Sequence, residues 1–244
     1  MGNTVSEVMK AWMLALFLWL GVFAAQAQAD RPALPHVVYI MADDLGIGDV
    51  KCYGGDRCAV DTPGFDRIAA EGMRFTDAHV VASICVPSRL AIMTGRYPWR
   101  FVAPKPDGQW GFLRPRMDID RFTIGDLMQQ RGYLTGYAGT GHLGTELAPP
   151  DGQLQGIGNV DYRQPLKIGP GDYGFERSMI LPGSLDMFPY AFVRDHRFVG
   201  RVTATKGWSA FNRQGPAAED FEDTKVLDTI AGEAEDFIAA AAKS

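Results

Sequence analysis

The sequence is poor in cysteine, and it has neither a run of basic residues nor an apolar stretch as long as a typical membrane span. Its 244 residues include 24 Lys and Arg against 29 Asp and Glu, which gives a net charge of −5. This balance argues against nucleic acid as the main partner. The hydrophobic share of 46% is that of an ordinary globular chain, and the length suffices to bury a substantial core.

The N-terminus carries the longest apolar run, from Ala11 to Ala25, preceded by Lys10. This run is shorter than the roughly 20 apolar residues that a spanning helix needs. Small residues then alternate up to Asp30. Together these features predict a secretory signal peptide over residues 1–29. We therefore expect an exported protein, periplasmic or secreted, with no stable membrane span after cleavage.

The chain has three cysteines, Cys52, Cys58 and Cys85. Export permits a disulfide, and Cys52 and Cys58 are near enough in sequence to close a small loop. Two thiols fit the same spacing as well as a bridge does. A Cys52–Cys58 pair would leave Cys85 as the odd cysteine.

Cys85 opens the most informative stretch of the chain, Cys85-Val86-Pro87-Ser88-Arg89, which runs on to Thr94-Gly95. Pro87 and Ser88 are helix-start residues and Gly95 is a natural stop, so a short helix is predicted with Cys85 just before its N-terminus. Arg89 follows within one turn, where its guanidinium can reach the same space and bind a tetrahedral oxyanion. The alternative is a cysteine that serves only as a small buried hydrophobe.

Two adjacent carboxylates, Asp43 and Asp44, follow a short apolar run at His36–Met41 that is rich in β-branched residues. The run predicts a buried strand, and ligands of open α/β sheets lie at the carboxyl ends of strands. A hard cation such as Ca²⁺ or Mg²⁺ prefers oxygen ligands of this kind. A solvated turn is the alternative reading of the same residues.

Hydrophobic periodicity and capping residues define the other expected elements, with Phe65 and Ile68 as core residues of the first helix. The alternation of strands and helices predicts an α/β fold with a largely parallel sheet. The elements are a helix over 62–72, a strand over 73–80, a helix over 123–132 opened by a capping box at Thr123, a strand over 133–138 and a helix over 217–242, with loops over 103–120 and 148–174.

His142 lies in a glycine-rich turn, Gly139-Thr140-Gly141-His142-Leu143-Gly144, directly after the strand expected over 133–138. A histidine in such a turn can approach a ligand closely and move a proton near neutral pH. A plain loop histidine is the alternative. His196 belongs to no comparable motif.

These segments together resemble the sulfatase family: Cys-x-Pro-Ser-Arg with a trailing Thr-Gly, a strand leading to Ala-Asp-Asp-x-Gly, and a glycine-rich turn with His-Leu-Gly. The resemblance implies an alkaline phosphatase-like α/β fold, a parallel or mixed sheet between helices, and arylsulfatase-like hydrolysis of sulfuric esters. It also implies that a maturation enzyme oxidises Cys85 to formylglycine, whose hydrate attacks the sulfur of a sulfate ester. The expected substrate is a sulfated small molecule or glycan.

The same resemblance assigns roles to the remaining site residues. Arg89 would stabilise the nucleophile, and His142 would act as an acid/base or as a partner of the diol. Asp43, Asp44 and the modified Cys85 would bind Ca²⁺, with Mg²⁺ as the other candidate cation.

The chain departs from the family at Thr140 and Gly141, which stand where sulfatases have Lys and Trp. Thr140 carries no positive charge, and losing one positioned charge in a catalytic site costs on the order of a hundredfold in rate. The family's other metal and sulfate ligands would lie beyond Ser244, so we expect residues 30–244 to be the N-terminal part of a sulfatase catalytic domain, truncated or encoded as a fragment. Two alternatives stay open: an inactive remnant or sulfated-ligand binder, and a phosphoester or phosphonate hydrolase on the same fold.

Overall fold

The computed structural model describes residues 34–100, 114–207 and 209–243. The chain divides into two compact units, residues 1–71 and 72–244, and each is described here by itself. The signal peptide expected over residues 1–29 lies outside the described residues. Within the described ranges, no helix is both long and apolar enough to cross a membrane.

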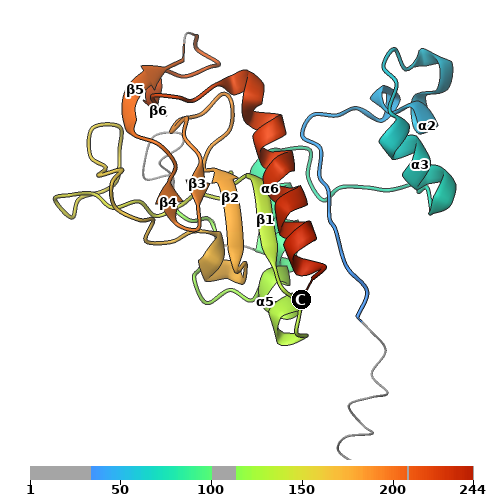
Figure 1. Ribbon diagram of the computed structural model, residues 1–244, viewed down its shortest axis with the longest axis horizontal. Coiled ribbons are helices and arrows are strands. Elements are labelled where there is room, and N and C mark those ends of the chain that lie inside the picture. Colours follow the sequence, from blue (N-terminus) through green and yellow to red (C-terminus); the bar gives the residue numbers. More distant parts are fainter. Residues whose placement is uncertain (1–33, 101–113, 208, 244) are drawn as a thin grey trace, which may run out of the picture. The chain divides into compact units, whose positions relative to one another are not determined.

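The described part of the first unit is built from short helices (Figure 1). The amide of Lys51 donates a hydrogen bond of 2.9 Å to the hydroxyl of Thr62, which ties α2 to the start of α3. The helix predicted over 62–72 is confirmed by α3, but Phe65 and Ile68 are 43% and 62% exposed and form no core there. The helices are two 3-10 turns at Ile47–Asp49 and Gly55–Arg57, α2 at Lys51–Gly54 and α3 at Pro63–Glu71.

The strand predicted at His36–Met41 is wrong. The segment is irregular and exposed, with 72% of Ile40 accessible to solvent. A strand must pair its backbone N–H and C=O groups with a neighbouring strand, and the described residues of the first unit contain none. The strand predicted over 73–80 is wrong for a related reason: this segment joins no sheet, and Met73 and Val80 are largely exposed.

A mixed four-stranded sheet forms the centre of the second unit, in the order β1-β2-β3-β4. β1 pairs with β2 in parallel, whereas the β2–β3 and β3–β4 pairs are antiparallel. The mixed sheet with helices confirms the α/β class, but the expectation of a largely parallel sheet is wrong, because only the β1–β2 pair of this sheet is parallel. β1 also begins three residues later than the predicted strand. The strands are β1 at Gly136–Thr140, β2 at Arg177–Leu181, β3 at Val193–Arg194, β4 at Arg197–Phe198, and the separate antiparallel pair β5 at Val202–Lys206 and β6 at Gly215–Ala218.

The helices of the second unit begin and end close to their sequence signals, with one exception. The capping box that opens α5 is present as predicted, since the amide of Asp126 donates to the Thr123 hydroxyl and the amide of Thr123 donates to the Asp126 carboxylate. The final helix begins later than predicted, because Ala217 and Ala218 are buried in β6. The helices are α4 at Cys85–Thr94, α5 at Ile124–Gln130, α6 at Val226–Ala241, and 3-10 turns at Pro98–Arg100, Pro170–Tyr173 and Asp223–Lys225.

Two hydrophobic clusters hold the second unit together. In the first, the sheet packs with β6 and α6, which runs beside β1 (Figure 1). The approach is close at Gly136, where an added Cβ would lie 2.7 Å from the ring of Phe237. In the second, Leu90 and Met93 of α4 pack with Met117 and partly buried neighbours. This second cluster fixes α4, and with it Cys85, in the second unit.

Candidate active site

Cys85 occupies the first turn of α4, which begins at this residue rather than just after it. Ile84 precedes it in an extended conformation, and the Ser88 hydroxyl donates to the carbonyl of Ala82 at 2.6 Å. Arg89 lies one turn further along the same helix face, as predicted. Gly95 ends the helix in the left-handed conformation with φ of 65°, which also agrees with the prediction. Cys85 is half-buried.

Arg89 is almost completely buried, with 6% of its surface exposed, and its Nη1 donates a hydrogen bond of 2.9 Å to the carbonyl oxygen of Thr140. The hydroxyl of Tyr137 donates to the same carbonyl at 3.0 Å. Burial raises the pKa of Tyr137, and the charge and hydrogen bond of Arg89 partly offset that rise. One carbonyl at the end of β1 therefore accepts two hydrogen bonds, one of them from a cation.

Tyr137 was missed by sequence reasoning. The only available signal is its place in the strand that leads into the His142 turn, three residues before Thr140. A tyrosine in a strand usually serves in packing, and Tyr137 does pack edge-on against Phe175, with ring centroids 5.3 Å apart. Its additional contact with Arg89 depends on how α4 docks, which the sequence pattern does not encode.

The turn that carries His142 continues the pairing of β1 with β2. The amide of Gly141 donates to Leu181 at 2.8 Å, and the amide of His142 donates to Pro182 at 3.1 Å. His142 has a φ of 55°, so its backbone turns sharply away from the strand direction. Arg89 and the His142 turn thus both attach to the carboxyl end of β1, where open α/β sheets place their ligands.

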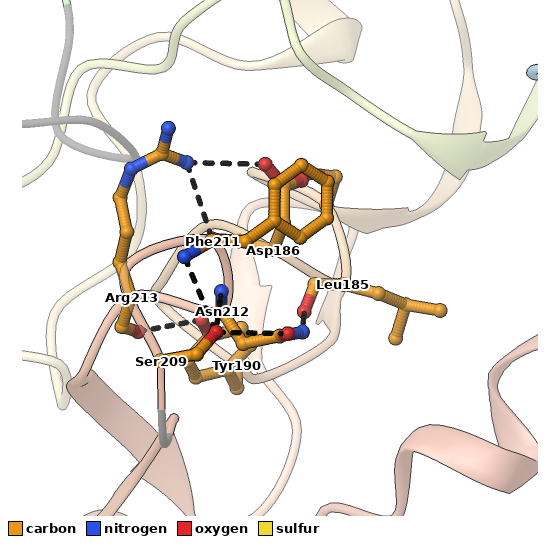
Figure 2. Close-up of polar contacts among 8 residues, drawn as sticks. Leu185, Asp186, Tyr190, Ser209, Phe211, Asn212 and Arg213 are labelled. Carbon is orange, nitrogen blue, oxygen red and sulfur yellow. Dashed lines mark hydrogen bonds and ion pairs between the residues drawn. The ribbon is translucent and has the colours of Figure 1, made fainter.

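A polar cluster holds the loop that follows β2 (Figure 2). Arg213 Nη1 donates to the Asp186 carboxylate at 3.0 Å and to the Asp186 carbonyl at 3.3 Å. The Tyr190 hydroxyl donates to the carbonyl of Arg213 at 2.6 Å, and the side-chain amide of Asn212 donates to Leu185 at 3.3 Å. These contacts anchor the loop to the segment between β5 and β6. Pro182, whose carbonyl accepts from the His142 amide, begins this loop.

Asp43 and Asp44 lie in the first unit, on an exposed irregular stretch. Asp44 has a φ of 61°, a conformation that aspartate tolerates better than most residues. The pair suits Ca²⁺ or Mg²⁺ in kind, because both cations prefer carboxylate oxygens. It does not suffice in number: across the described ranges, no group of three or more His, Cys, Asp or Glu side chains could hold a metal ion. The two carboxylates by themselves are therefore too few for a complete ligand set.

His196 has a structural environment in the turn between β3 and β4. Its Nε2 lies 3.4 Å from the Asp172 carboxylate, and its Nδ1 lies 3.2 Å from the Leu166 carbonyl.

Cys52 and Cys58 form no disulfide in the structure, and the Cys58 thiol donates to the carbonyl of Val60.

Comparison with known proteins identifies the family and the fold. Residues 35–147 match the family model described as Sulfatase. Over 170 residues, the chain is 35% identical to the N-acetylgalactosamine-6-O-sulfatase of Bacteroides thetaiotaomicron, covering 68% of this chain and 30% of that protein. Over 166 residues it is 38% identical to human arylsulfatase A, covering 68% and 28%. This chain belongs to the sulfatase family.

A solved structure from Bacteroides thetaiotaomicron, reported with the metabolism of multiple glycosaminoglycans, agrees with this assignment. The two structures superpose with a TM-score of 0.70 at 27% sequence identity. The match covers 86% of the present chain and 48% of the solved chain. The fold is therefore the alkaline phosphatase-like fold of sulfatases. The present chain spans about a third of the curated relatives it matches. The matched range contains the five site residues expected from the sequence, namely Asp43, Asp44, Cys85, Arg89 and His142.

Proposed function

We propose that this sulfatase chain takes part in the hydrolysis of sulfuric esters, with Cys85 converted to formylglycine. The observation that supports this most is the hydrogen bond from Arg89 to Thr140. Through it, the helix that begins at Cys85 and the turn that carries His142 attach to the same end of β1. The names of the relatives support a sulfated glycan or an aryl sulfate as the substrate class.

Each site residue has a role in this proposal. Formylglycine at position 85 would supply a hydrated aldehyde. One of its hydroxyls would attack the sulfur and displace the alcohol of the ester, and the other would release the sulfate as the aldehyde re-forms. The first turn of α4 favours an anion there, since its N–H groups have no partner within the helix and the helix dipole is positive at that end. Arg89 adds a fixed positive charge one turn away. His142 would donate or accept the proton that the reaction moves.

The cation belongs to the same proposal. Asp43 and Asp44 would hold Ca²⁺ or Mg²⁺, which would neutralise the charge of the sulfate group. Two carboxylates leave most of the six to eight Ca²⁺ positions to water or to other ligands. The expected signal peptide supports export, and the maturation enzyme would have to act on Cys85 in the same route.

The test combines the mass of the Cys85 peptide with an assay. The full chain is co-expressed with a formylglycine-generating enzyme, and turnover of an aryl sulfate is compared with that of an aryl phosphate in Ca²⁺ buffer. We expect Cys85 to be converted and the chain to turn over the aryl sulfate. Cys85→Ala should abolish this turnover, whereas His196→Gln should leave it unchanged. Preferential turnover of the phosphate would show a phosphoester hydrolase instead.

The uncharged side chain of Thr140 supports a second candidate function, in which the chain binds sulfated ligands without hydrolysing them. The residue brings no charge to the position where the family has a lysine. A converted Cys85 together with sulfate-ester binding and no turnover would establish this second function in place of the first.

A further inference from the structure

An aromatic surface follows α4 at the end opposite to Cys85. Tyr97 and Trp99 stack with ring centroids 4.3 Å apart and planes inclined by 13°. They nevertheless remain exposed, Tyr97 to 51% and Trp99 to 72%. Large aromatic side chains usually bury most of their surface, and a stacked pair left open to solvent presents a flat apolar face to a ligand.

Two arginines flank these rings. Arg96 and Arg100 are both exposed, and neither has an ion-pair partner among the described residues. No Asp or Glu stands between Asp77 and Arg100 in the sequence, although the whole chain has a net charge of −5. This segment is therefore locally cationic, and it can attract an anion that most of the chain would repel.

A hydrogen-bonded turn holds the backbone that carries these side chains. Pro98 restricts its own φ and opens a 3-10 turn over Pro98–Arg100, and the amide of Arg100 donates to the carbonyl of Tyr97 at 3.0 Å. The backbone of the turn and the stacked rings are thus ordered before a ligand arrives, which lowers the entropic cost of binding. Tyr, Trp and Arg are also the residues that contribute most to binding at protein interfaces.

We infer that Arg96, Tyr97, Trp99 and Arg100, here called the 96–100 platform, bind a sulfated polysaccharide. The rings would stack on sugar faces while the guanidinium groups pair with sulfate or carboxylate groups. A helix of 10 residues is about 15 Å long, so a single sulfated sugar bound at Cys85 could not reach the platform. A ligand that contacts both Cys85 and the platform must therefore be a polymer. The choice of a sulfated polymer among anionic glycans rests on the proposed function.

Binding by the full chain is measured against chondroitin sulfate, unsulfated hyaluronan and phosphatidylserine vesicles. The wild type should bind chondroitin sulfate, and more weakly as salt rises. Trp99→Ala should weaken binding about tenfold, as loss of a stacking ring does elsewhere, and Trp99→Phe should restore most of it. The double variant Arg96→Ala/Arg100→Ala should lose most of the salt dependence.

Phe211→Ala and Arg131→Ala are matched controls, because both side chains are exposed and lie outside the platform; they should bind like the wild type. Equal binding by Trp99→Ala and the wild type would overturn the inference, as would equal binding of hyaluronan. Tighter binding to the vesicles would show a membrane-contacting surface instead.

The platform and the proposed catalysis can fail separately. Cys85→Ala should abolish turnover and leave chondroitin sulfate binding intact, whereas Trp99→Ala should weaken that binding and leave aryl sulfate turnover unchanged. Binding without turnover would disprove only the catalytic proposal. Turnover with unaltered binding in Trp99→Ala would disprove only the platform.

Discussion

Arg89 donates from Nη1 to the carbonyl oxygen of Thr140 across 2.9 Å, and this bond joins the helix of Cys85 to the strand that leads into His142. The two residues are 51 positions apart in sequence. Because the guanidinium is almost completely buried, solvent competes little for it, and a hydrogen bond to a charged group is worth more than a neutral one.

Replacing Arg89 by alanine should therefore lower the free energy of unfolding by about 2–3 kcal/mol, since the Thr140 carbonyl loses a charged donor and a cavity remains. Urea denaturation of the full chain measures this. Arg131→Ala, at the exposed end of α5, is the control and should change stability by less than about 0.5 kcal/mol. Equal stability of the two variants would mean that the buried bond contributes nothing.

Tyr137→Phe should cost about 1 kcal/mol, because the ring keeps its contact with Phe175 while the hydrogen bond to Thr140 is lost. Arg89 and Tyr137 share one acceptor, so a double-mutant cycle with Arg89→Lys should give a coupling free energy of at least about 0.5 kcal/mol. Additive effects of the two substitutions would show that the shared carbonyl does not couple them.

Thr140→Lys places an ammonium group where the sulfatase family has one. If Cys85 is converted and the chain turns over, kcat/KM for an aryl sulfate should rise by about a hundredfold, since a positioned charge stabilises the ionised nucleophile. Thr140→Met is the matched control, with a long side chain and no charge. A similar gain from methionine would attribute the effect to side-chain bulk rather than to charge.

Tyr173 should contribute to the pH dependence of stability at alkaline pH. Burial first, then the carboxylates of Asp172, Asp118 and Glu146, raise the pKa of Tyr173 from 10.0 to about 12. The folded state thus keeps a proton that the unfolded chain loses. This contribution is fully present below pH 10.0 and disappears as the pH rises through about 12.

Tyr173→Phe removes both the titration and the hydrogen bond to Met117, which is 2.9 Å long. The variant should be about 1 kcal/mol less stable at neutral pH and should lose less stability between pH 10.0 and 12 than the wild type. Urea unfolding at several pH values measures both effects. An alkaline stability profile of Tyr173→Phe that matches the wild-type profile would refute the assignment.

Calcium should bind this chain weakly, with a dissociation constant on the order of a millimolar, because two carboxylates replace few of its water ligands. Asp43→Asn combined with Asp44→Asn should weaken binding at least tenfold in a calorimetric titration, and chelation should lower any sulfate turnover. Asp56→Asn is the control at another exposed aspartate of the same unit. Unaltered calcium affinity in the double variant would place the cation elsewhere.

The sequence predicted helices better than strands. The capping box at Thr123 and the stop at Gly95 were both found as predicted, and Cys85 and Arg89 share a helix face. Strands were less predictable, because an apolar run such as His36–Met41 becomes a strand only where a neighbouring strand accepts its hydrogen bonds. Residues 217–218 show the converse, since two alanines with high helix propensity became part of β6 when β5 provided a partner.

By itself, the sequence determined the family, the helix of Cys85 and the identity of the residues expected in the site, because motifs and helix caps act over a few neighbouring residues. Only the tertiary structure decided that Arg89 binds the carbonyl of Thr140, that Tyr137 shares that acceptor, and that Arg213 anchors the loop after β2. These contacts join residues on elements that pack together only after folding. Their partners are set by the docking of α4 and the β5–β6 pair, which local patterns of hydrophobic and capping residues do not specify.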